Sequence, residues 1–272
     1  MSYHTHGASG SQVHVRTLQG FIEDVARLPA DMFSRVIEQI ESRELDDIAG
    51  VYATSVLRLS HLWLIWEDKC RPRVRSRRTT QHPVCRDIED FMTAEGGTEV
   101  GAATYFNMEI KGLIAKMYGD IGPGLLVPSW VLNYSHRTDG EIVERLRSLS
   151  VEEQAARLPV FTASIYVIDA GVKAMMDYYA GKRSDFAHAV AGYLYWDVVK
   201  PCSYIADVFV ESILGGRELR EQYGRVYGST LAALEENDEA PVGVNYVRLV
   251  GKLADSVRRK MLEVLRNARL RS

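Results

Sequence analysis

The stretch NYVRLVGKLADSVRRKMLEVLRNA, residues 245–268, decides the fold class. Its apolar residues recur at intervals of three, four and seven, which is the spacing of one face of an α-helix. The stretches DMFSRVIEQI (31–40) and GEIVERLRSL (140–149) have the same spacing. No long window alternates apolar and polar residues with the period of two that is typical of a β-strand. The sequence therefore predicts an all-α protein.

Helix boundaries are marked by Gly or Pro combined with polar residues. Such breaks occur at GDIGPG (119–124), HRTDG (136–140), GG (215–216) and NDEAPVG (237–243). Ser150 precedes VEEQ, and a Ser followed three residues later by a Glu is the pattern of a capping box. We therefore expect a helix to begin directly after Ser150.

The composition is that of a globular protein. Hydrophobic residues make up 46% and charged residues 25% of the 272-residue chain, which is long enough for one large core or two smaller ones. The apolar run LWLIW (62–66) is much shorter than the roughly 20 residues that a membrane span needs. The first residues, MSYHTHGASGSQ, contain no apolar signal core. We therefore expect a cytoplasmic protein that does not bind membranes.

Three cysteines, Cys70, Cys85 and Cys202, are an odd number, and no CxxC pair occurs. This pattern favours reduced thiols over a disulfide framework or a zinc site. We expect neither a metal ion nor a cofactor.

Five arginines gather in RPRVRSRRTTQH, residues 71–82, although the net charge of the chain is −3. They are Arg71, Arg73, Arg75, Arg77 and Arg78. One such run is usually a solvated flank or a loop paired to acidic residues, and docking of a phosphate or sulfate is the alternative. We expect no nucleic-acid partner.

An internal repeat is the most informative pattern in the chain. The string ARLP occurs at 26–29 and again at 156–159, an offset of 130 residues. At the same offset, WLIWE (63–67) aligns with YLYWD (193–197). Two matches in register, one of them containing a Trp, predict a duplicated helical unit of about 130 residues.

The duplication predicts how the chain is organised. The expected segments are a flexible N-terminal tail over 1–19, a first helical repeat over 20–149 and a second over 150–272. Two like halves packed about a pseudo-twofold axis leave a central crevice, where small-molecule sites commonly lie. Superposition of the halves should place Trp66 over Trp196 and Pro29 over Pro159, with both tryptophans in the core.

Three segments resemble a known family. LSHLWLIWEDKCRPRV (59–74), MYGDIGPGLLVP (117–128) and DYYAGKRSDF (177–186) are similar to motifs of the group I 2-haloacid dehalogenases, also called the DehI type. Members of that family are all-helical and are built from two related halves. The last motif ends in Ser-Asp-Phe in the family, as it does here at Ser184, Asp185 and Phe186. The resemblance covers about residues 20–262.

The resemblance implies displacement at a saturated carbon, with Asp185 as the general base. In the family, that Asp and the Asn of an Asn-Pro-Lys motif hold a water, which attacks the carbon bearing the halogen with inversion and without an ester intermediate. General-base assistance is worth roughly 10² to 10⁴ in rate. An Asp before an amphipathic segment is also a common helix N-cap, and Ser184 is equally suited to capping.

The chain departs from the family at two places. Gly122-Pro123 stands where the family has the water-holding Asn, and Asp120 belongs to a two-residue insertion before it. Asp46 and Asp47 align near apolar pocket residues of the family. Carboxylates there would repel a small haloacid anion and are suited to an ammonium group, or they mark an exposed helix N-terminus.

These departures leave several functions open. The chain either hydrolyses a 2-haloacid, with Asp120 or Tyr118 replacing the Asn, or lets a substrate amine or hydroxyl displace a vicinal halide or sulfate. The second reaction closes a small ring of the aziridine type and is favoured as a step in natural-product biosynthesis. A non-catalytic ligand-binding or assembly role is the third interpretation. We expect a small-molecule substrate, and a homodimer or a small partner subunit is compatible with the sequence.

The predicted site combines the catalytic residue with residues expected to bind substrate. Asp185 is the catalytic candidate, and the binding candidates are Asp46, Asp47, Tyr118, Gly122, Ser184, Phe186 and Tyr246. For Tyr246, in VNYVRLV, the alternative is a core tyrosine with a bonded hydroxyl.

Overall fold

Helices form all the regular structure that is described. The computed structural model describes residues 17–70, 83–94, 102–125, 138–181, 194–200, 202–203, 211, 214–237 and 243–272. Within those ranges there is no β-strand, which confirms the all-α prediction. The α-helices are α1 (Leu18–Ala26), α2 (Ala30–Glu41), α3 (Asp46–Ile65), α5 (Pro83–Ala94), α6 (Ala102–Ile121), α8 (Thr138–Arg147), α9 (Val151–Gly181), α12 (Arg217–Glu236) and α13 (Tyr246–Arg269). Two segments are π-helical: η1 (Trp66–Cys70) and η3 (Leu194–Val199).

Local sequence determines several helix ends. The predicted capping box at the start of α9 is confirmed: the N–H of Glu153 donates to Ser150 Oγ (3.1 Å), and the N–H of Ser150 donates to Glu153 Oε2 (2.8 Å). The side chain of Asn245 accepts the N–H of Arg248 and caps α13. Gly124, in the turn after α6, has φ 72°, a left-handed conformation that favours glycine.

Helix α9 lies at the centre of the core, with α3 running parallel to it. The residue numbers of contacting pairs increase in the same direction along both helices. Ser164 Oγ donates to the carbonyl of Ala49 (3.5 Å), and the Tyr179 hydroxyl lies 3.0 Å from His61 Nε2. Between these contacts, a Cβ on Gly171 would lie 2.5 Å from the Leu57 side chain, so a larger residue there would push the two helices apart. The C-terminal ends of α3 and α9 therefore lie side by side.

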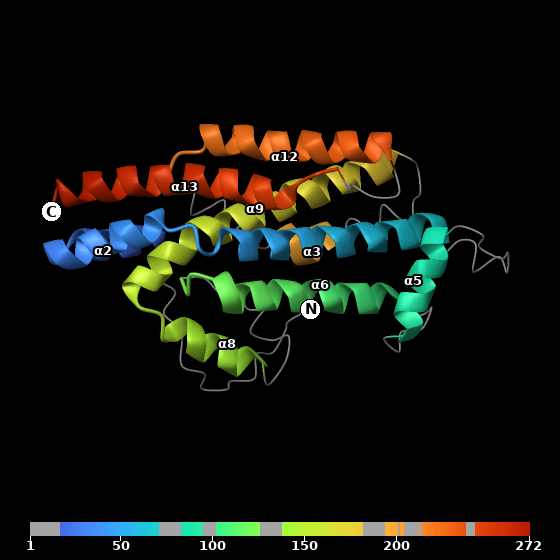
Figure 1. The fold of residues 1–272 in the computed structure, drawn as a ribbon, viewed down its shortest axis with the longest axis horizontal. Helices are drawn as coiled ribbons and strands as arrows, with labels where there is room; N and C mark the ends of the chain where they lie inside the picture. The colour runs from blue at the N-terminus through green and yellow to red at the C-terminus, as the bar shows by residue number, and fades with distance from the viewer. Residues whose placement is uncertain are drawn as a thin grey trace, which may run out of the picture.

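Helices α12 and α13 pack antiparallel to each other. Glu218, at the start of α12, accepts from Arg259 in the second half of α13, whereas Thr230 in α12 contacts Tyr246 at the start of α13. Helix α13 also packs against the start of α3, where a Cβ on Gly50 would lie 2.6 Å from the Cα of Val247. In Figure 1, α3, α6, α12 and α13 extend roughly along the long axis and α5 stands across one end.

The internal duplication is not confirmed. Pro29 is exposed and precedes α2, whereas Pro159 is buried within α9. Helices from both expected halves share one hydrophobic core. Trp66 is buried there, but Trp196 is 61% exposed, so the prediction that both tryptophans are core residues is wrong for Trp196.

The predicted N-terminal tail, residues 1–19, lies outside the described residues as far as residue 16. Residues beyond that point are part of the fold. Leu18 is the first residue of α1, and its side chain is buried in the core. Thr17 caps this helix, since its side chain accepts the N–H of Gly20. The tail boundary predicted at residue 19 is therefore too late in the chain.

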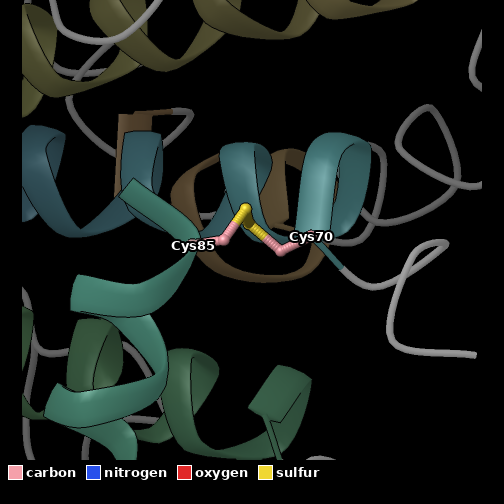
Figure 2. The surroundings of a disulfide bond; sticks show 2 residues. All are labelled: Cys70 and Cys85. Atoms are coloured by element: carbon pink, nitrogen blue, oxygen red, sulfur yellow. A yellow bond between two sulfur atoms is a disulfide. The ribbon is translucent and has the colours of Figure 1, made fainter. Parts of the chain in front are cut away.

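A disulfide bond contradicts the prediction of three reduced thiols. Cys70, the last residue of η1, is bonded to Cys85 in the first turn of α5, with their Cα atoms 5.5 Å apart (Figure 2). The prediction failed because pairing depends on how the chain folds back over the 15-residue separation, and the spacing alone does not show it. Cys202 is a free and buried thiol.

Two helical runs in the described part of the chain are long and apolar enough to cross a membrane. They are Asp46–Cys70 and Val151–Gly181, and 56% and 94% of their most apolar windows are buried inside the protein. A core helix of a folded protein meets the same criterion, so these runs are weak evidence for membrane insertion.

Candidate functional site

The residues that carry the family resemblance most directly lie outside the described part of the chain. They are Ser184, Asp185 and Phe186, and the Arg71–Arg78 cluster also lies outside it. The segment that contains Asp185 follows directly on α9, whose last residue is Gly181. The neighbourhood of that helix end is therefore the described part of the candidate site.

Three buried side chains with polar groups lie near the adjoining ends of α3 and α9. His61 on α3 is 2% exposed, and its Nε2 lies 3.0 Å from the hydroxyl of Tyr179, which is fully buried on α9. Glu67 follows in η1 and is also fully buried. We call His61, Glu67 and Tyr179 the polar end cluster.

The chemistry of the polar end cluster suits acid–base work. An imidazole exchanges protons near neutral pH, a phenol donates a hydrogen bond, and a carboxylate accepts one. Polar groups are costly to bury unless they are hydrogen-bonded, so a core rarely collects them without need. A π-helical turn such as η1 is also uncommon and is frequent at functional sites. The cluster is therefore the best described candidate for a reaction centre.

A second group of polar residues lies in the core around the middle of α9. Asp169 on α9 is 2% exposed and accepts a 2.5 Å hydrogen bond from the hydroxyl of Tyr223 on α12. The pKa of Cys202 is raised to about 12, chiefly because the thiol is buried. A hydrogen bond with the Tyr118 hydroxyl lowers this pKa, and the charge of Asp169 raises it. The thiol is therefore protonated at neutral pH and is not a nucleophile.

Tyr118, a predicted substrate-binding residue, lies in this core region. Its ring packs edge-on against Phe161 with centroids 4.6 Å apart, and its side chain is fully buried. Burial raises the pKa of its hydroxyl well above the ordinary value, and the neighbouring Cys202 adds to that shift. Tyr118 is therefore a neutral phenol that contributes to the core.

Gly122 directly follows the last residue of α6, and the backbone there leaves no room for a side chain. Its N–H donates to the carbonyl of Tyr118 (3.0 Å), and a Cβ at this position would lie 2.2 Å from that same oxygen. An Asn in this conformation would clash with the backbone. The loss of the family's water-holding residue is thus built into the turn.

Asp120, in the same turn, is held by two donors. The hydroxyl of Tyr52 on α3 donates to Oδ2, and Arg145 on α8 donates to Oδ1 at 3.2 Å. Burial, together with the hydrogen bond to Asp120, raises the pKa of Tyr52 to about 12. The Tyr52 hydroxyl therefore stays protonated and tethers the end of α6 to α3.

Asp46 and Asp47 occupy the first turn of α3, which agrees with the interpretation that they mark a helix N-terminus. Arg258 on α13 donates to both carboxylate oxygens of Asp46, and both side chains are largely buried. The carboxylate of Asp46 is consequently already paired with a cation and does not offer a site for a substrate ammonium. Asp47 is exposed.

Tyr246 is a core tyrosine with a bonded hydroxyl. It is 3% exposed, and its hydroxyl lies 3.1 Å from Thr230 Oγ1. Burial raises its pKa to about 12, against a lowering by Thr230. This agrees with the packing interpretation of Tyr246.

Those predicted binding residues that the structure describes therefore lie nearer the start of α3 than its end. Asp46 and Asp47 lie there, Tyr246 precedes Val247, which contacts Gly50, and Tyr52 binds the α6 turn. The polar end cluster lies near the other end of α3. Fifteen residues separate Asp46 from His61, which corresponds to about 22 Å of helix.

Sequence reasoning missed His61, Glu67, Tyr179 and Asp169. A signal for Asp169 was available, because it is the lone acidic residue in the apolar run FTASIYVIDAGV (161–172). An isolated ionisable residue in such a run is a candidate for a perturbed or functional group. His61 and Glu67 stand at the two ends of the apolar run LWLIW (62–66), where each has a polar neighbour on its other side, so neither is isolated within an apolar run as Asp169 is.

Among the described ranges, no three His, Cys, Asp or Glu side chains are arranged to hold a metal ion. Comparisons with protein-family models, curated proteins and solved structures found no match. The resemblance to the group I 2-haloacid dehalogenases therefore rests on the three sequence segments alone.

Proposed function

We propose that the chain catalyses displacement of a leaving group at a saturated carbon, with Asp185 as the general base. The observation that carries the proposal is the polar end cluster. His61 and Tyr179 are buried and in contact near the end of α9, and the segment with Asp185 begins three residues after Tyr179, at residue 182. A base that follows closely in the sequence on a buried polar pair would, if it joined that pair, abstract a proton away from bulk water, and this is the arrangement that the proposal requires.

The nucleophile belongs to the substrate in this proposal. Gly122 leaves no space for a residue that would hold a water as the family's Asn does, which supports an internal amine or hydroxyl. With an amine, the N–C bond forms as the carbon–halogen or carbon–sulfate bond breaks. The leaving group departs with the bonding electrons, and the carboxylate of Asp185 takes the proton from nitrogen. The product is a three-membered ring of the aziridine type.

The pairing of Asp46 with Arg258 removes one reason for this choice. The recognition of a substrate ammonium at Asp46 is not retained, because that carboxylate already binds a guanidinium. The ring-closure proposal now depends on Gly122.

Hydrolysis of a 2-haloacid is the second candidate, and the geometry of Asp120 favours it. Tyr52 and Arg145 fix this carboxylate in the turn where the family has its water-holding Asn. A fixed carboxylate has further lone pairs that are able to accept from a water. In this reaction, a water oxygen would form the new bond to carbon.

The remaining parts of the proposal concern the setting of the reaction. We propose a small-molecule substrate, no cofactor and a cytoplasmic location, and a homodimer or a small partner subunit is compatible with it. A disulfide is more frequent in proteins of oxidising compartments, so the location is the part of the proposal with the least support.

Turnover in ¹⁸O-labelled water tests the proposal. The probes are 2-chloropropionate and a β-chloroamine, and chloride release is measured after subtraction of the protein-free reaction. Ring closure predicts catalysed chloride release from the chloroamine and a cyclic product without label. Label at the substituted carbon would establish hydrolysis instead. No catalysed release from either probe class, nor from the corresponding sulfate esters, would favour the non-catalytic binding role.

A further inference from the structure

The Cys70–Cys85 disulfide joins two elements that meet at one end of the bundle. Cys70 closes η1, which continues α3, and Cys85 lies in the first turn of α5 (Figure 2). Both side chains are fully buried. The bond is therefore an internal link between the α3 rod and a helix that stands across its end (Figure 1).

Helix α5 has few other buried attachments in its described part. Of the side chains described for it, residues 83–90, those of Cys85 and Ile88 are buried, Val84 and Glu89 are half-buried with Val84 packed against the core, and the other four are exposed. Its packing within the described structure is concentrated on η1. Burial of Ile88 is worth about 1.5–3 kcal/mol, and the half-buried Val84 adds less than that. The covalent bond is therefore a large part of what holds residues 83–90 on η1.

We propose that Cys70 and Cys85 form a redox latch, in which the disulfide fixes α5 on η1 and the two thiols leave α5 able to open. This inference goes beyond the displacement reaction and does not depend on it. Closing the latch forms one S–S bond and releases two protons and two electrons, which a second disulfide such as oxidised glutathione accepts. Opening it requires a dithiol that is oxidised in turn.

Burial of the two sulfur atoms slows reduction of the disulfide more than it slows its formation. Exchange begins with attack of a thiolate on a disulfide sulfur, and neither sulfur is accessible while α5 is docked. Reduction therefore has to wait for a local opening of α5. Oxidation of the open form has no such barrier, so a closed latch persists after the oxidant is gone.

The third cysteine does not interfere with this chemistry. Cys202 is buried and stays protonated at neutral pH, because burial raises its pKa to about 12. Exchange requires the thiolate, so Cys202 does not attack the disulfide. It is also the natural control position.

Hydrogen exchange of the full chain, read by mass spectrometry, tests the latch. The protein is first oxidised with glutathione and then compared with and without dithiothreitol. We expect amide exchange in residues 83–90 to become at least about tenfold faster on reduction, while α9, α12 and α13 remain protected. Cys70→Ser and Cys85→Ser should show the fast exchange without reductant, and Cys202→Ala should not.

Three results would overturn the latch. The first is unchanged protection of residues 83–90 after reduction, which would mean that non-covalent contacts hold α5. The second is loss of protection throughout α9, α12 and α13, which would mean that the bond supports the whole fold. The third is two free thiols at Cys70 and Cys85 after oxidation with glutathione. Reduction in urea should also be much faster than reduction of the native protein, and equal rates would contradict the protected bond.

Discussion

The segments η1 and η3 have similar sequences and the same uncommon helix type, but different surroundings. WLIWE (63–67) ends in the first two residues of η1, whereas residues 194–197 of YLYWD lie within η3, and both segments are π-helical. Trp66 in η1 is 1% exposed, whereas Trp196 in η3 is 61% exposed. The aligned residues also differ in part in conformation, since Leu64 and Ile65 belong to α3 whereas Leu194 and Tyr195 belong to η3. Similar local sequence thus does not fix burial, and the elements that pack around each segment decide which side chains are buried.

The two ARLP strings differ in conformation as well as in burial. In the first, the chain leaves α1 at Arg27, and Pro29 precedes α2. In the second, α9 continues through Pro159 without interruption. A proline is a helix breaker in isolation, so its place inside α9 shows that packing of a long buried helix overrides local preference.

Truncation of the two tryptophans gives the largest expected effect and sharpens the comparison. Trp66→Ala should lower the free energy of unfolding by about 3–5 kcal/mol, because it leaves a cavity in the core. Trp196→Ala should change it by no more than about 0.5 kcal/mol, as is usual for exposed positions. Urea denaturation measures both. Equal losses would break the comparison, since Trp196 would then have to be covered in solution.

Alkaline pH should expose the next largest effect, at Cys202, which follows η3. In the folded protein the pKa of the Cys202 thiol is raised to about 12. The buried thiol therefore contributes fully to stability below the pKa that it has in the unfolded chain, and this contribution is lost as the pH rises from that pKa towards the folded pKa. With an unfolded thiol pKa of about 8.5, this loss is about 2 kcal/mol between pH 8 and pH 10. Cys202→Ala should show a smaller fall in urea midpoint over that range. The buried tyrosines titrate in both proteins, so an identical fall would exclude the thiol as a cause.

Removal of the α9 cap has the smallest expected effect. Ser150→Ala should cost about 1 kcal/mol, since it leaves the N–H of Glu153 without its side-chain acceptor. Ser34→Ala is the matched control, because Ser34 is exposed and donates only to the carbonyl of Ala30 within α2. Thermal unfolding of the two variants checks the difference. A loss for Ser34→Ala as large as that for Ser150→Ala would argue against the cap.

Local patterns predicted those features that local sequence determines. The helix of residues 246–269 follows from its periodicity, and the Ser150 cap follows from a four-residue motif. Features made by distant residues were not predictable in this way. The ion pair of Asp46 with Arg258 spans 212 residues, and the His61–Tyr179 contact spans 118.

The candidate site shows the same limit. The sequence interpretation of Asp46 used only its negative charge, whereas in the structure this charge is paired with Arg258 on α13. Gly122 was recognised as a missing side chain, and the structure adds the reason that none fits. Both corrections concern backbone or side-chain neighbours that no single stretch of sequence contains.

Asp185→Asn tests the proposed chemistry most directly, because the change preserves size and much of the capping capacity while removing the proton acceptor. Asp177→Asn is the control, since Asp177 on α9 is already bound by Lys173 (2.6 Å) and Tyr227 (2.9 Å). We predict that chloride release from the β-chloroamine falls at least about a hundredfold in Asp185→Asn, with little change in melting temperature, and that Asp177→Asn keeps its turnover. Retained turnover in Asp185→Asn together with a lower melting temperature would show that Asp185 is a helix cap and would contradict its role as the base.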